Sequence, residues 1–384
     1  MFFPFLLLLI CCRVNAIDGL PPRSAAQSRL FATEHLKSQA EMLRTTTLEW
    51  VSPEFEIEYE DTSSQELRGE IGYSLGSRRR ARILNRKNQI QGKENSLHFQ
   101  ILEVQTLARL RELWIDLYTS QLELREMQDY YSVVSEILKK ISKQAQSGWG
   151  APLDAKRLMV KKTLIGTSLQ GLRNQVTKSR ILYSEALGQE IPKDMGLVLP
   201  KTLELGNWGK IPSLGGLQKS VLELFGEQKE LEKGLLKQET GFNPSISFGL
   251  IKEKSIRPDP MFRLGFVLPD KNKEDMGLKA IQIETQIQSL KSQQASFVES
   301  LMVGELEKMY TETHKFTLNE VIPAAQKAKE IALETQKAWV SGQMSLTDWL
   351  DSLEVWEEMI GAKASQIRET LNLEIQWVLW KGKL

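Results

Sequence analysis

The sequence contains few residues of the kinds that form disulfides or bind metal ions. Its 384 residues include two cysteines, Cys11 and Cys12, and three histidines, His35, His98 and His314, which are far apart in the chain. If the first 16 residues are removed, the chain has no thiol for a disulfide or for a cysteine metal site. Isolated histidines do not form a ligand cluster. The sequence therefore predicts no cofactor and no metal site.

An excess of charge of one sign is also lacking. Lysine and arginine total 50, aspartate and glutamate total 49, and the formal net charge is +1. This balance gives no reason to expect nucleic acid as a partner, because nucleic acid is bound by a basic surface. The sequence also lacks a phosphate-binding loop and the serine, histidine and aspartate order of a hydrolase. We therefore expect a protein that is not an enzyme.

Long apolar runs are absent after the N-terminus. Phe5–Ile10 is a short apolar run and Val14–Ala16 ends on a small residue, so residues 1–16 are predicted to be a secretory signal peptide. Two alternatives remain, a buried N-terminal helix and acylation of Cys11 or Cys12. No later run is long enough for a membrane-spanning helix, so any membrane span must be made of strands.

Two similar segments interrupt long helical patterns. Asp154 follows Gly148 by six residues, and Asp348 follows Gly342 by six residues. A glycine allows the chain to leave a helix, and Pro152 in the first copy is well placed to start the next one. In the second copy either of two hydroxyl residues, Ser345 or Thr347, can cap the following helix. We interpret these segments as the tips of two copies of one helical hairpin.

The flanking patterns extend this repeat to the whole chain. Helices are predicted at 24–49, 78–147, 152–187, 217–240 and 275–340, with a last return helix ending near Gly382. We assign residues 17–191 to the first structural repeat, 192–214 to an irregular linker and 215–384 to the second repeat. Pro323 lies inside the second long helix and is expected to kink it.

Strands are predicted between the shorter and the longer helix of each copy. Apolar and polar residues alternate over 54–60, 67–75, 246–250 and 262–268, which predicts two hairpins with one apolar face. Strands of about ten residues can cross an outer membrane when tilted. Four strands cannot close a barrel, and open edges are not tolerated in lipid. Three copies would supply twelve strands, which is an allowed even number.

On this plan the chain resembles the TolC-like outer-membrane factors, the trimeric exit ducts of efflux pumps and type I secretion systems. The tip Gly342–Asp351 resembles the family's entrance turn, and Asn243–Pro244 with Phe266–Pro269 resembles its strand pair. Gly76–Arg82 resembles the basic run of its metal-efflux branch. The resemblance covers essentially the whole mature chain.

The resemblance implies a fold that is mainly α with a small transmembrane β part. Duplicated long antiparallel helical hairpins and four strands per chain would close as a trimeric 12-stranded barrel with a periplasmic helical tunnel. The implied function is the exit duct of a tripartite efflux pump, passing small molecules or metal cations from periplasm to exterior. A type I secretion duct is one alternative, and a non-pore periplasmic coiled-coil structural protein is another.

The implied location is the cell outer membrane, with an extension into the periplasm. The implied partners are two further copies of the chain, outer-membrane lipid, a periplasmic adaptor protein and an inner-membrane transporter that supplies the energy.

The resemblance also places Asp348 and Asp351 at the periplasmic mouth, where rings of carboxylates would attract cations. The alternative is an ordinary favourable charge at a helix N-terminus. For the two tip tryptophans, adaptor contact and packing between hairpins both remain open. The expected lumen residues are Glu54, Glu56, Glu58, Arg68 and Arg263, and the expected tip residues are Gly148, Trp149, Asp154, Gly342 and Trp349.

Overall fold

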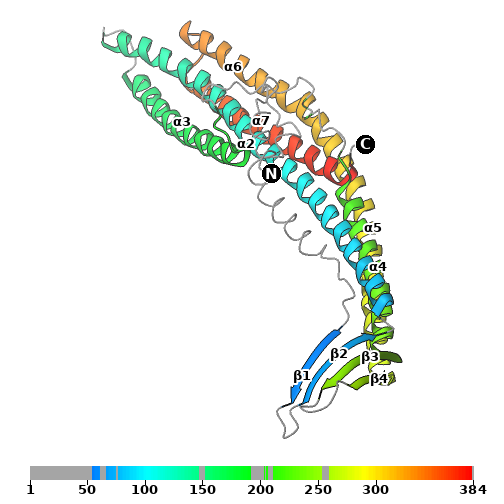
Figure 1. The fold of residues 1–384 in the computed structure, drawn as a ribbon. Helices are drawn as coiled ribbons and strands as arrows, with labels where there is room; N and C mark the ends of the chain where they lie inside the picture. Colours follow the sequence, from blue (N-terminus) through cyan, green and yellow to red (C-terminus); the bar gives the residue numbers. More distant parts are fainter. Residues whose placement is uncertain are drawn as a thin grey trace. The chain divides into compact units, whose positions relative to one another are not determined.

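The computed structural model describes residues 54–60, 66–74, 77–146, 152–191, 203, 205, 211–252 and 259–382 (Figure 1). Some predicted features lie outside the described residues: the signal peptide at 1–16, the helix at 24–49, and the tip residues Gly148 and Trp149. The same holds for the side chains of Glu54, Glu56, Glu58 and Arg68, whose backbone is described.

The chain forms two compact units, and each combines segments from both halves of the sequence. The hairpin unit contains residues 1–34, 102–214 and 299–384, and the strand unit contains residues 35–101 and 215–298. Both units draw on both predicted repeats, so a repeat of the sequence is not a compact unit of the structure. The residue boundaries of the repeats stay a prediction.

The strand unit contains one antiparallel sheet. Its strands are β1 (Glu54–Glu60), β2 (Glu66–Ser74), β3 (Asn243–Lys252) and β4 (Asp259–Val267), in the order β1-β2-β3-β4. Both predicted hairpins are confirmed. They join through β2 and β3, where Ile71 lies opposite Phe248. In the single chain, β1 and β4 are the two edges of this sheet.

The helices follow the predicted order. They are α2 (Ser77–Gln146), α3 (Pro152–Leu187), α4 (Leu214–Thr240), α5 (Lys271–Phe316), the π-helical turn η2 (Thr317–Val321), α6 (Ile322–Val340) and α7 (Leu346–Lys381). The bounds of α2, α3 and α4, and the end of α7, agree with the sequence prediction within three residues.

The helix predicted over 275–340, which Pro323 was expected to kink, is interrupted in its middle, where η2 separates α5 from α6. The N–H of Ile322 donates to the carbonyl of Thr317, five residues back. Pro323 has no N–H and its ring disturbs the preceding turn, so an α-helical ladder is weakened at this place. A single π-helical turn contains one additional residue and so accommodates the missing N–H and the bulk of the proline ring. The hydroxyl groups of Thr317 and Thr370 lie 2.8 Å apart and are buried between η2 and α7.

In the strand unit, α4 lies between α2 and α5. Lys87 of α2 forms an ion pair with Glu232 of α4 (3.3 Å), and Lys229 of α4 forms one with Glu284 of α5 (2.6 Å). Lys229 also pairs with Glu232 on its own helix (2.7 Å). These half-buried pairs fix α4 against both neighbours.

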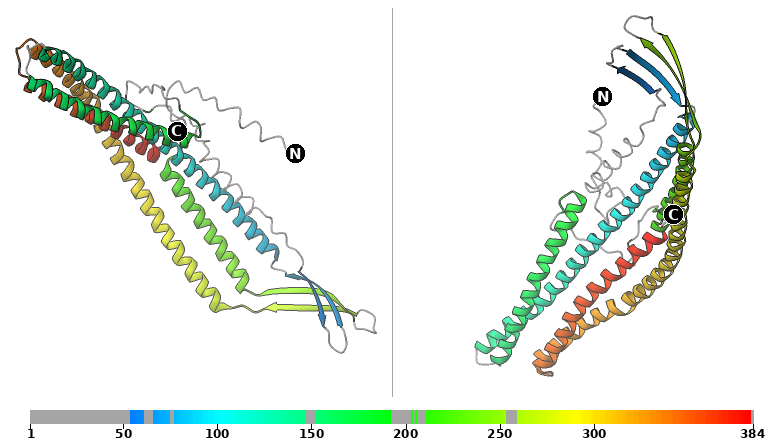
Figure 2. Two further views of the ribbon diagram at one scale, coloured as in Figure 1. Left: turned by 90° about the vertical axis from the view of Figure 1, so that its left-hand side faces the viewer. Right: turned by 90° about the horizontal axis from the view of Figure 1, so that it is seen from below.

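In the hairpin unit, α2 and α7 lie together, and α3 and α6 flank them on opposite sides (Figures 1 and 2). The rings of Tyr130 on α2 and Trp356 on α7 meet edge to face, with centroids 5.1 Å apart. Arg368 of α7 donates to the hydroxyl of Thr119 on α2 (3.1 Å). One apolar core joins all four helices, with buried members that include Tyr130, Val134, Ile137, Leu158, Ile165, Ala328, Ala332, Trp349, Leu353 and Ile360.

Candidate functional site

The tip of the second hairpin is a tight glycine turn between α6 and α7. Gly342 has a φ of +76°, in the left-handed region that favours glycine. Its N–H donates to the carbonyl of Trp339 (2.9 Å), and the N–H of Gln343 donates to the carbonyl of Ala338 (2.8 Å). These two bonds satisfy the last carbonyls of α6 and form a Schellman motif. The same pair of bonds ends α3 at Gly188.

Ser345 and Asp348 together start α7. The hydroxyl oxygen of Ser345 accepts a bond from the N–H of Asp348 (3.2 Å), and the Asp348 carboxylate accepts one from the N–H of Ser345 (3.1 Å). The Ser345 hydroxyl also donates to this carboxylate (2.7 Å). This arrangement is a capping box, so Ser345 is confirmed as the cap rather than Thr347. The hydrogen bonds from the hydroxyl and from the backbone N–H of Ser345 lower the pKa of Asp348 below its ordinary value of 3.8, and the hydroxyl bond has the larger effect.

Asp351 lies one turn further along α7 and is exposed, as Asp348 is. Residues three apart share a helix face, so the two carboxylates are neighbours on the solvent side of the helix start. Among the described residues, no side-chain hydrogen bond or ion pair engages the Asp351 carboxylate. The structure therefore gives Asp348 the helix-start role that was the alternative interpretation, while both carboxylates stay open to solvent. Their selection of cations remains a prediction.

Trp349 is a packing residue in the single chain. Its side chain is fully buried, and its ring stacks on that of Trp339 with centroids 4.9 Å apart. Its indole N–H donates to the carbonyl of Ala332 on α6 (3.2 Å). This burial favours the packing alternative, because a side chain without exposed surface cannot contact an adaptor directly. Any adaptor contact at this tip must use its exposed neighbours.

The first tip has its aspartate at the matching place. Asp154 lies in the first turn of α3, and Asp348 lies in the first turn of α7. Each is the third residue of its helix, and both helices contain 36 residues. This correspondence follows from the repeat that the sequence predicted. Asp154 is half-buried, so it presents less carboxylate surface than Asp348.

The predicted lumen residues share one face of the sheet. Glu58 lies opposite Arg68 across β1 and β2, and Arg263 lies opposite Ser247 across β3 and β4. Because paired positions in a sheet point to the same side and alternate along a strand, the register places all five predicted positions on one face. The other face carries the large apolar residues. Those described as exposed are Ile71, Ile246, Phe248, Leu250, Phe262, Leu264 and Phe266.

Ion pairs tie the two helical hairpins together within the hairpin unit. Glu357 of α7 accepts bonds from Lys161 of α3 (2.9 Å) and from Tyr130 of α2 (3.4 Å). Lys329 of α6 pairs with Asp129 of α2 (3.2 Å). Lys363 of α7 pairs with Glu126 of α2. Sequence analysis did not predict these pairs, because each joins residues about 200 positions apart.

A buried charged pair holds the chain at Leu205, within the predicted linker. The Leu205 N–H donates to Glu374 of α7 (2.7 Å), and Arg111 of α2 donates to the Leu205 carbonyl (3.2 Å). Burial lowers the pKa of Arg111 to about 10, while Glu374 and Tyr183 act in the opposite direction. Sequence analysis missed this pair.

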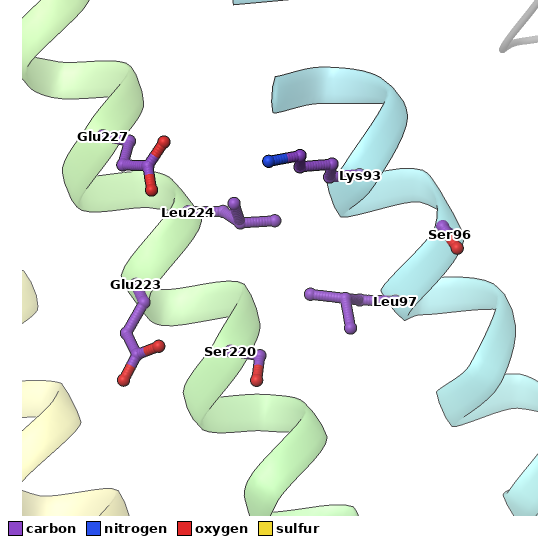
Figure 3. A pocket seen from close by; sticks show the side chains of 7 residues that line it. All are labelled: Lys93, Ser96, Leu97, Ser220, Glu223, Leu224 and Glu227. Atoms are coloured by element: carbon purple, nitrogen blue, oxygen red, sulfur yellow. The ribbon is translucent and has the colours of Figure 1, made fainter. Parts of the chain in front are cut away.

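The strand unit contains an open groove of about 350 Å³ between α2 and α4 (Figure 3). Leu97 and Leu224 point toward each other across it, and Lys93 faces Glu227 at one end. The other lining residues are Ser96, Ser220 and Glu223. The groove is shallow and its charges are solvated, so it offers no set of converging groups for a cofactor.

Two further observations bear on the class of site. Within the described ranges, no three histidine, cysteine, aspartate or glutamate side chains are placed to hold a metal ion. Among the helices that the structure describes, none combines the length and the apolar character that crossing a membrane requires.

No protein-family model matches the sequence, and no curated protein matches it in a sequence comparison. The structure is nevertheless similar to solved channel structures over most of its length. One neighbour is CusC, from a study of folding and transmembrane channel formation, with a TM-score of 0.76 and 10% identity over 94% of this chain and 91% of that chain.

Two outer-membrane channels are similar in the same way. The Campylobacter jejuni CmeC channel has a TM-score of 0.72 and 10% identity, over 95% of this chain and 84% of that chain. The open state of the Neisseria gonorrhoeae MtrE channel has a TM-score of 0.72 and 13% identity, over 94% of this chain and 88% of that chain. The chain therefore has the fold of outer-membrane channels, and the predicted fold, mainly helical with a small strand part, is confirmed.

Proposed function

We propose that the chain is the outer-membrane exit duct of a tripartite efflux pump and works as a homotrimer. The observation that carries the proposal is the likeness to channel folds over more than nine-tenths of the chain. OprN, CmeC and MtrE are named as outer-membrane channels, and this chain shares their fold. As an exit duct it passes small molecules or metal cations from the periplasm to the exterior.

The sheet supports a membrane location and an oligomer. One face carries exposed large apolar side chains, and most residues of the opposite face are, by register, charged or small. A strand of this pattern suits lipid on one side and water on the other. The single chain leaves β1 and β4 as open edges, which lipid does not tolerate. Three copies would pair these edges and close a barrel of twelve strands.

Two alternatives make different predictions. A non-pore coiled-coil scaffold has no use for a sheet with an exposed apolar face, so the strands argue against it. A type I secretion duct shares this architecture and differs only in its partners and cargo. In either duct, a periplasmic adaptor at the tips and an inner-membrane transporter complete the machine, because the proposed duct performs no chemistry and must take its energy from a partner.

The assembly and the pore are tested together on the purified mature chain. In mild detergent we expect a trimer by light scattering, and in a planar bilayer we expect discrete conductance steps. The migration of the detergent-extracted protein on a gel should also change on heating, as barrels usually show. Monomers or dimers alone, or a trimer that never conducts, would contradict the proposal. A deletion strain then separates the two ducts: sensitivity to dyes, detergents or metal salts indicates efflux, and loss of a secreted protein indicates secretion.

A further inference from the structure

A group of arginines lies where the sheet of the strand unit gives way to its helices. Arg79, Arg80 and Arg82 follow the end of β2 within eight residues, and their side chains are exposed. The start of a helix carries partial positive charge, so cations are unfavourable there, and the first turn of α2 contains no acidic residue that would offset them. The arginines therefore act against the helix that carries them, which points to a role outside it.

Most of this positive charge is not neutralised within the chain. Arg80 lies 3.8 Å from Glu239 of α4, and these side chains are 59% and 48% exposed, so the pair is weak. In the part of the chain that the structure describes, no ion pair or hydrogen bond engages the side chain of Arg79 or that of Arg82. A guanidinium group is a planar fork of N–H donors, whose geometry matches a phosphate group. The two groups are thus available to an anionic ligand.

The strand register places the arginines at one end of the sheet. Ser74 ends β2 and lies opposite Ser245 of β3, which in turn lies opposite Gly265 of β4. Gly265 is two residues from the end of β4. Helix α2 begins at Ser77, three residues after β2 ends. The start of α2 therefore follows the same row of the sheet that precedes the end of β4.

Aromatic side chains mark this end of the apolar face. Phe266 and Phe242 are each 60% exposed, and their rings stack with centroids 5.7 Å apart. Leu268, just after β4, is 78% exposed. In membrane barrels, aromatic side chains form girdles where hydrocarbon gives way to lipid headgroups. The stacked pair thus indicates this boundary, and the arginines come just beyond it.

The other charges at this end of the sheet largely cancel. Lys271 and Lys273 are exposed at the start of α5, beside the exposed carboxylates of Asp270 and Asp275. The Asp270 carboxylate also accepts a bond from the N–H of Lys273 (3.0 Å). The excess of positive charge is therefore greatest at the start of α2.

We propose that Arg79, Arg80 and Arg82 bind the phosphate groups of anionic phospholipids, in the leaflet on the helical side of the membrane. The position of the arginines favours a lipid over an acidic protein, because they border on the apolar face of the sheet. Long arginine side chains can lie along acyl chains and keep their charged ends at the headgroups. Basic residues next to a membrane-spanning segment are attracted to anionic lipid in this way. The inference rests on the proposed function, since only a chain inserted in a membrane meets these headgroups.

Native mass spectrometry of the purified mature chain in mild detergent tests the lipid site. Phosphatidylglycerol is the anionic probe, and phosphatidylcholine with the same acyl chains is the probe without net charge. The chain should bind phosphatidylglycerol in preference. Arg79→Gln with Arg80→Gln and Arg82→Gln should weaken this binding about tenfold and leave the binding of phosphatidylcholine unchanged. Lysine at the same three positions keeps the charge without the fork and should give an intermediate affinity.

The matched control removes the same charge from another helix. Arg157→Gln with Arg173→Gln and Lys178→Gln changes three exposed residues of α3 in the hairpin unit, and phosphatidylglycerol binding should equal that of the parent chain. Since arginines at a helix start do not stabilise it, the triple glutamine variant of α2 should keep its thermal stability in detergent without anionic lipid. Thermal unfolding in that detergent therefore shows that the variant is folded.

The mass of each complex also gives the number of copies, so the two proposals can fail separately. A trimer without a preference for phosphatidylglycerol, or equal losses in the two glutamine variants, overturns the lipid site alone. The absence of any trimer overturns the proposed function. If the α2 variant changes ion selectivity in a planar bilayer and leaves lipid binding unaltered, the arginines face the lumen, and the lipid site is overturned as well.

Discussion

Asp348 and Trp349 are adjacent in sequence and have different roles at the tip. The carboxylate is exposed and closes the first turn of α7 through Ser345, while the ring is buried against Trp339. A helix start that is held by both groups is rigid, because the cap fixes the backbone and the ring fixes the packing. The orientation of the Asp348 carboxylate is therefore determined within one chain, before any assembly.

The capping box makes a prediction about the titration of Asp348. Ser345→Ala removes the hydroxyl bond that has the largest effect on this carboxyl, so the pKa of Asp348 should rise toward 3.8. In the native chain the folded pKa is depressed. The carboxylate thus adds stability above about pH 3.8, and this contribution is lost as the pH falls through the lowered pKa. NMR titration of the carboxyl carbon in the full chain measures the shift.

The control for this prediction is Ser341→Ala, which removes a hydroxyl that bonds Ala338 at the end of α6 and does not touch Asp348. Its effect on the pKa of Asp348 should be negligible. If the pKa of Asp348 is unchanged in Ser345→Ala as well, the capping box does not persist in solution.

At the scale of elements, the register of the strands decides which substitutions the sheet tolerates. Phe248 belongs to the apolar face and is exposed in the single chain, whereas Ser247 lies on the other face, opposite Arg263. Phe248→Arg should cost roughly 2–4 kcal/mol of folding free energy in lipid if the residue is near the membrane midplane. Refolding into lipid vesicles over a urea series measures this cost.

Ser247→Glu is the matched charged control on the neighbouring residue. The new carboxylate would face the lumen and lie across from Arg263, so it should be tolerated. Arginine is a poorer control there, because it would place two like charges opposite each other. Equal losses from Phe248→Arg and Ser247→Glu would show that the assignment of the two faces is wrong.

Two glycines at helix ends differ in a way that substitution can reveal. Gly342 and Gly382 both have positive φ, but a Cβ at Gly342 would meet no atom within 4 Å. At Gly382 a Cβ would lie 2.7 Å from the backbone nitrogen of Ser213 and 3.1 Å from the carbonyl oxygen of Ile211. Gly382 thus allows the end of α7 to approach the segment before α4.

Gly342→Ala should therefore cost only the strain of a left-handed residue, about 1–2 kcal/mol. Gly382→Ala should cost more, because its backbone conformation is almost restricted to glycine and the facing backbone cannot move aside. Thermal unfolding of the two variants gives the comparison. An equal loss of stability would mean that the close approach of α7 to residues 211–213 is not maintained in solution.

At the scale of the whole molecule, an assembly multiplies the charges at the tip. One chain presents Asp348 and Asp351 on one helix face, and three chains would form two rings of carboxylates about the axis of the duct. A ring of like charges around a narrow opening attracts cations more strongly than separate carboxylates do. The prediction of a cation-selective mouth therefore applies only to the assembled duct.

The structure shows how this prediction should be tested. Alanine at Asp348 would remove the cap as well as the charge, so Asp348→Asn with Asp351→Asn is preferable, since the amide oxygen of asparagine can still accept the bonds from Ser345. In a planar bilayer without partner proteins, the double variant should lose cation preference and resist block by multivalent cations. Each single variant should change less. Unaltered selectivity and block in the double variant would leave both residues with a helix-start role only.

Much of the architecture could be predicted because local sequence patterns specify where helices, strands and turns form. The six-residue spacing from Gly148 to Asp154 and from Gly342 to Asp348 identified both tips, and helix bounds followed from periodicity and proline positions. The alternation over 54–60 and 246–250 predicted the apolar face of the sheet. The candidate site could be predicted less well, because it depends on which side chains become buried. The local sequence around Trp349 is compatible both with a ring that packs inward and with a ring that projects toward a partner.

By itself, then, the sequence determined the type, order and duplication of the elements, since helical and strand periods and glycine stops act between residues close in the chain. Tertiary structure alone decided the pairing of β2 with β3, the burial of Trp349 and the clamp that Arg111 and Glu374 form on Leu205. Each of these features depends on contacts between segments far apart in sequence. A local sequence pattern does not specify which of these contacts form or how strong they are.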